Sequence, residues 1–309
     1  MNNFLLVKNM AFVGVADQSA TGFECKTGHV FVNIYERLKV AQDPALHIKT
    51  NHPHYLVHRF LELHNVSYER CLDHSCLVPA EYGELFLDAA KAIQEELLSV
   101  EAAAKLLDKT VSEDVDVADS DSFHKLMERC HELIDSLAPL KHELAGVNLL
   151  IETAAQSRGG NVPGFATLRA VTSRSFSPTL AKNYPDVYEQ CLKEKVTGSL
   201  SLHYKGPELP TPIIDFERDY TDDELRQLHR QYWSLVTEIK LLDNLLDVEK
   251  LHLKVAIGRS NSSTQLFAYY RRVVREVDAP TMRQNHPDVY EACKVEQTSF
   301  KCTVQPWSE

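Results

Sequence analysis

Apolar residues recur three or four positions apart over two long stretches of the chain, the pattern of a helix with one narrow apolar stripe. The first stretch runs from about Phe123 to Ala155 and contains Pro139, which we expect to kink the helix or break it in two. The second runs from about Asp222 to Ile257, and Thr221 with Glu224 has the spacing of a capping box. The pattern predicts two long helices, the second roughly 54 Å long.

The second helix belongs to a copy of the first. Residues 280–296 (PTMRQNHPDVYEACKVE) repeat residues 178–194 (PTLAKNYPDVYEQCLKE) at an offset of 102 positions, and the apolar stripes of the two helices align at the same offset. A turn, a strand, a short helix and a closing strand follow each long helix. The expected fold class is α+β and mostly α, with long helical arms and two duplicated helix–strand–helix–strand units.

The rest of the chain divides where its composition changes. Short apolar runs joined by turn residues, and a helix near 54–64, predict a small N-terminal α+β domain. The expected divisions are a partner-binding N-terminal domain at 1–80, a helix and acidic turn at 81–122, repeat unit 1 at 123–206, a proline-bearing linker at 207–220 and repeat unit 2 at 221–309.

Long helices with narrow apolar stripes need another helix to cover them. Either the two stripes face each other within the chain, or the helix at 81–108 covers one and a second subunit covers the other. Three long helices are an odd number for pairing, so we expect self-association through a helical arm. The candidate interface is the stripe of the second unit: Leu225, Leu228, Tyr232, Leu235, Ile239, Leu242, Leu246 and Leu253.

Each repeat places an arginine on a mostly apolar strand face, where it needs an acidic partner. The duplicated Asp186/Asp288 and Glu189/Glu291 are the available acidic residues. The tyrosine of each PDVYE block is expected to pack its helix onto the strands. The expected structural core of the repeats is Arg169, Asp186, Tyr188, Arg271, Asp288 and Tyr290.

The charge balance bears on the class of partner. Among 309 residues the formal net charge is −11, which disfavours general binding of phosphate backbones, although a local basic patch is compatible with it. We therefore expect a protein partner and no direct nucleic-acid contact. No long apolar run predicts a membrane span or secretory signal, and seven scattered cysteines fit reduced thiols, so a cytoplasmic location and no membrane partner are expected.

Two groups of residues in the N-terminal region have the composition of metal sites. Asp17, Glu24 and Lys26 have the spacing of a nuclease metal site, although an exposed hairpin explains them as well. Cys71 and Cys76 lie in the His- and Cys-rich region 47–76, which either binds a metal or holds ordinary packing and surface residues. We assign no catalytic residue, metal ligand or cofactor, and we expect a non-enzymatic protein.

Both repeats resemble the helical C-terminal appendage of YqaJ-type phage recombination nucleases. The resemblance covers about 123–204 and 225–304 and is carried by Phe165, Arg169, the block Pro185–Glu189 and their copies. It implies a phage protein with a duplicated interaction module. The preceding nuclease domain is not recognisable beyond the Asp, Glu and Lys of the N-terminal constellation, which speaks against nuclease activity.

The overall organisation, acidic and two-unit with helical arms, also resembles phage-encoded inhibitors of the Gabija defence system, although no short motif carries this match. It implies a homo-oligomeric inhibitor in the host cytoplasm that occludes a host DNA-processing or defence nuclease complex. Two alternatives stay open. One is a recombination nuclease relative or accessory subunit with Mg²⁺-dependent chemistry in the N-terminal region, and the other is a structural assembly protein.

Overall fold

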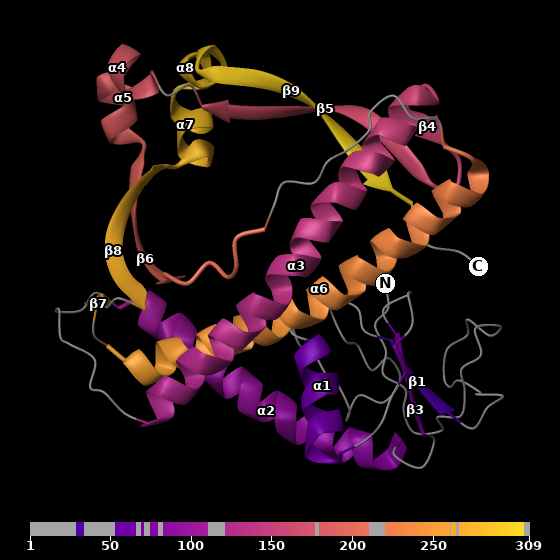
Figure 1. Ribbon diagram of the computed structural model, residues 1–309. Helices are drawn as coiled ribbons and strands as arrows, with labels where there is room; N and C mark the ends of the chain where they lie inside the picture. The colour runs from indigo at the N-terminus through magenta and orange to yellow at the C-terminus, as the bar shows by residue number, and fades with distance from the viewer. Residues whose placement is uncertain are drawn as a thin grey trace.

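The computed structural model in Figure 1 describes residues 29–33, 53–65, 69–70, 75–79, 83–110, 121–176, 179–209, 220–259, 261–263 and 266–305. Its centre is a pair of antiparallel helices, α3 (Asp121–Ser157) and α6 (Asp222–Ile257). The bounds of α6 are those predicted, and so is its capping box, in which Thr221 N–H donates to Glu224 Oε2 at 2.8 Å. α3 continues through Pro139, so of the two predicted outcomes, a kink or a break into two helices, the break is not found. The chain is mostly α within the α+β class.

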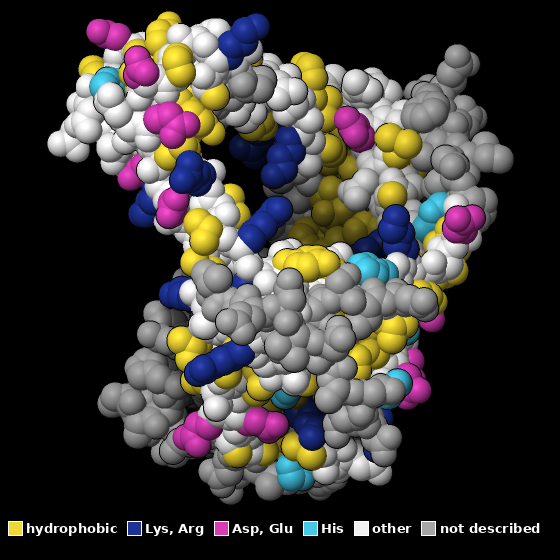
Figure 2. Space-filling view, turned by 90° about the vertical axis from the view of Figure 1, so that its left-hand side faces the viewer, with side chains coloured by type: hydrophobic (Ala, Val, Ile, Leu, Met, Phe, Trp, Pro, Cys, Tyr) yellow, Lys and Arg dark blue, Asp and Glu magenta, His cyan; other side chains and the backbone are white. Residues whose placement is uncertain are grey.

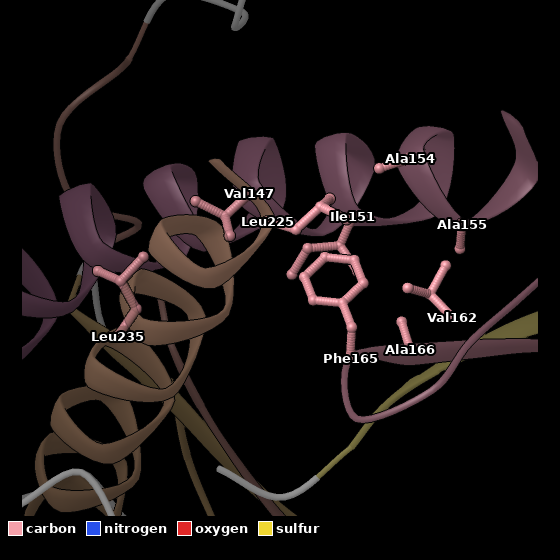
Figure 3. Close-up of a cluster of buried hydrophobic side chains, with 9 residues drawn as sticks. All are labelled: Val147, Ile151, Ala154, Ala155, Val162, Phe165, Ala166, Leu225 and Leu235. Carbon is pink, nitrogen blue, oxygen red and sulfur yellow. The ribbon is translucent and has the colours of Figure 1, made fainter. Parts of the chain in front are cut away.

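The apolar stripes of the two helices face each other within one chain. Three buried clusters follow the pair from end to end. The first joins Val147 and Ile151 of α3 to Leu225 and Leu235 of α6, and Figure 3 shows Phe165 from the following turn pointing into it. The other two are made mainly of Cys130, Leu133, Leu137, Ile239, Leu241, Leu245 and Leu246, and of Phe123, Met127, Leu253, Ile257, Phe267 and Tyr269.

This packing corrects the assignment of the α6 stripe to an interface between copies. Five of the eight candidate side chains are buried, and Leu228, Tyr232 and Leu242 are partly buried against the same clusters. The five buried ones are Leu225, Leu235, Ile239, Leu246 and Leu253, all 0–8% exposed. Because each stripe covers the other, neither needs a second subunit. The alternative in which the two stripes pair within the chain is the correct one.

The two repeats exchange strands. β5 (Ala166–Phe176) of the first repeat pairs with β9 (Lys294–Val304) of the second, and β6 (Leu192–Leu202) pairs with β8 (Phe267–Val277), both antiparallel. We call β5 with β9 ribbon 1, and β6 with β8 ribbon 2. Short strands β4 (Asn161–Val162) and β7 (Ser262–Ser263) extend each ribbon at its base. The repeats are therefore interlocked and share their sheets.

The two ribbons differ in register by one residue. In ribbon 2, Phe267 pairs with Leu202, so the offset of 102 would pair Phe165 with Val304 in ribbon 1. Instead, Ala166 pairs with Val304. Because successive side chains of a strand point to opposite faces, this shift exchanges the faces of β5 relative to its partner.

Backbone hydrogen bonds beside the ribbons show the same shift. Gln305 N–H donates to the carbonyl oxygen of Phe165 at 2.8 Å in ribbon 1. The corresponding residue His203 donates to the carbonyl oxygen of Leu266, rather than Phe267, at 2.8 Å in ribbon 2. The internal symmetry predicted by the repeat is therefore broken at the sheets.

The far ends of both ribbons meet in a helical tip (Figure 1). It consists of α4 (Leu180–Asn183), α5 (Pro185–Gln190), α7 (Ala279–Asn285) and α8 (Pro287–Ala292). Its core pairs corresponding residues of the two repeats, Leu180 with Met282 and Cys191 with Cys293, all buried. Asp278 N–H also donates to the carbonyl oxygen of Cys191 at 2.8 Å. Each ribbon is thus held at both ends.

The C-terminal end of α2 (Gly83–Asp108) contacts β6 of ribbon 2. Its last residue, Asp108, accepts hydrogen bonds from Lys254 Nζ at 2.7 Å and from Tyr269 Oη at 2.9 Å. A Cβ at Gly198 of β6 would lie 2.8 Å from Asp108 Cα, so only glycine allows this approach. The corresponding residue of ribbon 1 is Phe300, which is 71% exposed.

The described N-terminal elements pack beside α2 and α6. α1 (Pro53–Leu63) occupies the predicted helix region, and Tyr55 N–H donates to Asn244 Oδ1 of α6 at 2.9 Å. A small antiparallel sheet has the order β1 (His29–Asn33), β3 (Ser75–Pro79), β2 (Glu69–Arg70). Across the residues described, no helix is both long and apolar enough to cross a membrane.

Candidate functional site

The duplicated arginines of the two repeats have different surroundings. Arg271 is 3% exposed. Its backbone N–H and its Nε donate to Asn261 Oδ1 at 2.9 and 3.3 Å, and its Nη1 donates to the carbonyl oxygen of Gly258 at 3.1 Å. Its guanidinium carbon lies 5.0 Å from the centre of the Tyr269 ring. Arg169 is exposed, because the register shift of ribbon 1 turns it away from the core.

These contacts correct the predicted acidic partner of the repeat arginines. The acceptors of Arg271 are an amide and a carbonyl oxygen, whereas Asp186 and Asp288 are exposed in the first turns of α5 and α8. There they face the positive ends of short helices. Tyr188 and Tyr290 are half-buried, and both pack against the buried residues of the helical tip.

Cys130, Cys191 and Cys293 are buried thiols, and Cys302 is a partly buried one. Burial, with a smaller contribution from Glu249, raises the pKa of Cys130 to about 12. Burial is also the main cause of the raised pKa of Cys191, Cys293 and Cys302. At neutral pH these groups are therefore protonated, and a protonated thiol is a poor nucleophile.

The predicted metal-site candidates fall largely outside the described residues. Asp17, Glu24, Lys26 and Cys71 all lie outside them, and Cys76 is described only as part of strand β3. In the parts of the chain that the structure describes, no three His, Cys, Asp or Glu side chains come together as possible metal ligands. The two N-terminal constellations stay as sequence-based hypotheses.

Charge is distributed unevenly between the helices and the ribbons. The four long strands carry nine basic and three acidic residues, a net charge of +6. Helices α2, α3 and α6 carry ten basic and nineteen acidic residues, a net charge of −9. The chain's overall charge of −11 therefore conceals a basic region.

Most of this positive charge lies on one face of each ribbon. We call this the outer face, because the alternate side chains point to the core at the base of the ribbon. On ribbon 1 it comprises Thr167, Arg169, Val171, Ser173, Ser175, Val295, Gln297, Ser299, Lys301 and Thr303. On ribbon 2 it comprises Lys193, Lys195, Thr197, Ser199, Ser201, Ala268, Tyr270, Arg272, Val274 and Glu276. Of these twenty residues, five are basic, eight are Ser or Thr and one is acidic.

Arg169 and Lys301 lie directly opposite each other on the outer face of ribbon 1, and both are exposed. Neither forms an ion pair with any acidic side chain in the described ranges. Two like charges facing each other across a strand pair destabilise it unless an anion lies between them. The one acidic residue of the outer faces, Glu276 of ribbon 2, forms an ion pair with Lys195, whose Nζ lies 3.7 Å from its carboxylate.

Figure 2 shows where the basic side chains gather. Lys and Arg appear in dark blue along the region between the helical tip and the helix pair, beside a hollow in the surface. An exposed surface with basic, hydroxyl and amide side chains can bind several phosphate groups in a row. The sequence carried a signal of this surface in the basic, Ser/Thr-rich strands of both repeats, but it did not indicate which strands lie together.

Comparison with known proteins identifies no relative: no protein-family model, curated protein or solved structure matches the chain. The resemblances to YqaJ-type nucleases and to Gabija inhibitors therefore stay predictions.

Proposed function

We propose that the protein is a non-enzymatic interaction protein that acts in DNA processing by holding nucleic acid on the outer faces of its two ribbons. The observation that supports this most strongly is the separation of charge, +6 on the four strands against −9 on the three long helices. The polyanion meets the ribbons, while the acidic helices repel it. Such separation steers a polyanion to one side of a protein.

This proposal replaces the expectation of no direct nucleic-acid contact. That expectation used the net charge of −11, which averages two regions of opposite sign. The proposal keeps the predicted biological effect, because a protein that covers DNA denies it to a host DNA-processing or defence complex. The proposal is also compatible with one alternative from the sequence, an accessory subunit in phage recombination.

The test is a binding titration of the full-length protein with fluorescent DNA at several salt concentrations. Between about 50 and 200 mM salt, the logarithm of the affinity should fall linearly with the logarithm of the salt concentration. The double substitution Arg169→Gln with Lys301→Gln should weaken binding and reduce the steepness of this line by about two, one for each lost phosphate contact.

A matched control uses two exposed lysines of the helices. The pair Lys125→Gln and Lys240→Gln removes the same charge from α3 and α6. Its salt dependence should equal that of the unmodified protein. Absence of salt-dependent binding, or equal losses in the ribbon and helix variants, would refute the proposal.

A second function, direct occlusion of a protein partner, is favoured by exposed apolar side chains on the ribbons. Val171, Val273 and Val295 are 38, 50 and 45% exposed. If this function is correct, the protein should inhibit a host DNA-degrading complex in equal measure with and without the Arg169→Gln and Lys301→Gln substitutions. If inhibition requires these two residues, masking of DNA is the mechanism. Self-association stays a prediction, and sedimentation of the purified protein measures it directly.

A further inference from the structure

The outer face of ribbon 2 carries an exposed aromatic ring beside its basic residues. Tyr270 is 47% exposed, and the residue opposite it on β6 is Ser199. Its diagonal neighbours on that strand are Thr197 and Ser201, which are also small. Small neighbours leave the faces of an aromatic ring open, so a flat partner can reach Tyr270 from the solvent.

A row of positive charge begins next to this ring. Arg272 is two residues further along β8 and therefore on the same face. Lys195 lies opposite Val274, and Lys193 lies opposite Glu276 at the end of the row. From Tyr270 to Glu276 the strand extends about 20 Å. Over this distance the face carries three basic side chains and one acidic one, Glu276, which forms an ion pair with Lys195.

Ribbon 1 differs at the corresponding place because of its register. Its most exposed aromatic residue, Phe300, lies opposite Ala170, on the face away from Arg169 and Lys301. The ring of Phe300 and the facing cations Arg169 and Lys301 are therefore on opposite sides of ribbon 1. Phe300 shares its face with Arg174 and Lys294 near the far end of the ribbon, whereas Tyr270 of ribbon 2 has Arg272 as the next residue on its own face.

We propose that the outer face of ribbon 2 binds single-stranded nucleic acid, with one base stacked on Tyr270 and the following phosphates held by Arg272, Lys195 and Lys193. Unpaired bases expose their flat faces, whereas the bases of a duplex already stack on one another. A ring flanked by cations is the arrangement that single-strand-binding proteins use. This inference rests on the proposed function and names the form of nucleic acid that the surface prefers.

The test measures the affinity of the full-length protein for a labelled oligothymidine of about 12 nucleotides, for oligouridine of the same length and for a DNA duplex. Oligothymidine and oligouridine distinguish DNA from RNA as the source of the single strand. Tyr270→Thr removes the ring but keeps strand propensity. It should weaken single-strand binding by about 5- to 100-fold and leave duplex binding unchanged.

Two further variants separate stacking from other effects. Tyr270→Phe retains the ring and should restore binding to about the original affinity. Phe300→Ala removes the more exposed ring on the other face of ribbon 1 and should change nothing. Circular dichroism of each variant confirms that the strands are intact.

The outcomes separate this inference from the function on which it rests. The stacking site is refuted if Tyr270→Thr binds single strands as tightly as the unmodified protein, or if duplex DNA binds more tightly than single strands. In either case the proposed binding of nucleic acid to the basic outer faces still holds. If the unmodified protein binds no nucleic acid at low salt, both proposals fall.

Discussion

The contact between α2 and ribbon 2 can be tested with a single methyl group. Gly198→Ala places a Cβ 2.8 Å from both Cα and Cγ of Asp108, and closer still to one of its carboxylate oxygens. Real Cβ atoms essentially never make contacts this short, and one of the three atoms, Cα, belongs to the backbone at the end of the helix rather than to a flexible side chain. The end of α2 must therefore move away from the ribbon.

The expected cost follows from what Asp108 loses when it moves. Its carboxylate accepts from Tyr269 at 2.9 Å and from Lys254 at 2.7 Å, and the Asp108 and Lys254 side chains are 27% and 17% exposed. Hydrogen bonds to charged groups contribute about 1.5–3 kcal/mol each, less where water reaches them. We expect Gly198→Ala to lower the free energy of unfolding by about 2–4 kcal/mol, which reaches slightly above the usual cost of overpacking, about 1–3 kcal/mol.

Urea unfolding followed by circular dichroism measures this loss, and a double-mutant cycle tests its cause. Tyr269→Phe removes the hydroxyl that donates to Asp108. It should cost about 1–2 kcal/mol in the unmodified protein and close to nothing beside Gly198→Ala, where the hydrogen bond is already broken. Ser199→Ala, on the exposed outer face, is the control and should change stability by less than about 0.5 kcal/mol. Equal costs of Tyr269→Phe in both backgrounds would show that the reasoning is wrong.

Three further predictions concern the helix pair. Leu235→Ala should lower the free energy of unfolding by about 2–5 kcal/mol by leaving a cavity between α3 and α6, without changing the sedimentation coefficient of the folded protein. Pro139→Ala should raise it by about 1–3 kcal/mol, because Pro139 is exposed inside α3 and alanine restores a helical N–H donor; unchanged or lower stability in urea would contradict this. Burial is the main cause of the raised pKa of Glu249, so the folded state favours its protonated form and loses that contribution as pH rises above the carboxyl's unfolded pKa. Glu249→Gln should therefore raise the melting temperature at pH 7.5, and the gain should shrink towards pH 4; a gain independent of pH would refute this account.

Local patterns in the sequence were sufficient to predict the helices. The spacing of apolar residues predicted α6 from Asp222 to Ile257, and Thr221 with Glu224 predicted how it begins. These signals act over three or four residues, so they are readable without knowledge of the rest of the fold. The repeat likewise predicted that each long helix is followed by two strands with a short helical segment between them.

The tertiary structure decided which elements meet. The sequence favoured a contact between copies over pairing of the two apolar stripes, and the antiparallel pairing of α3 with α6 corrects this by burying both stripes within one chain. It also decided that β5 pairs with β9 and β6 with β8, which assembles the basic outer faces from paired residues that are 65 to 138 positions apart in the sequence. Strand pairing depends on contacts between distant segments, and these leave no local periodicity.

The sequence repeat does not predict the strand register of the two ribbons. Arg169 and Arg271 are equivalent in sequence, yet one is exposed beside Lys301 and the other is buried against Tyr269. A shift of one residue along a strand changes which face a side chain occupies, and the two ribbons differ by such a shift. The sequence by itself determined the helices and the duplicated units, whereas only the tertiary structure decided which copy of each repeated side chain reaches the solvent.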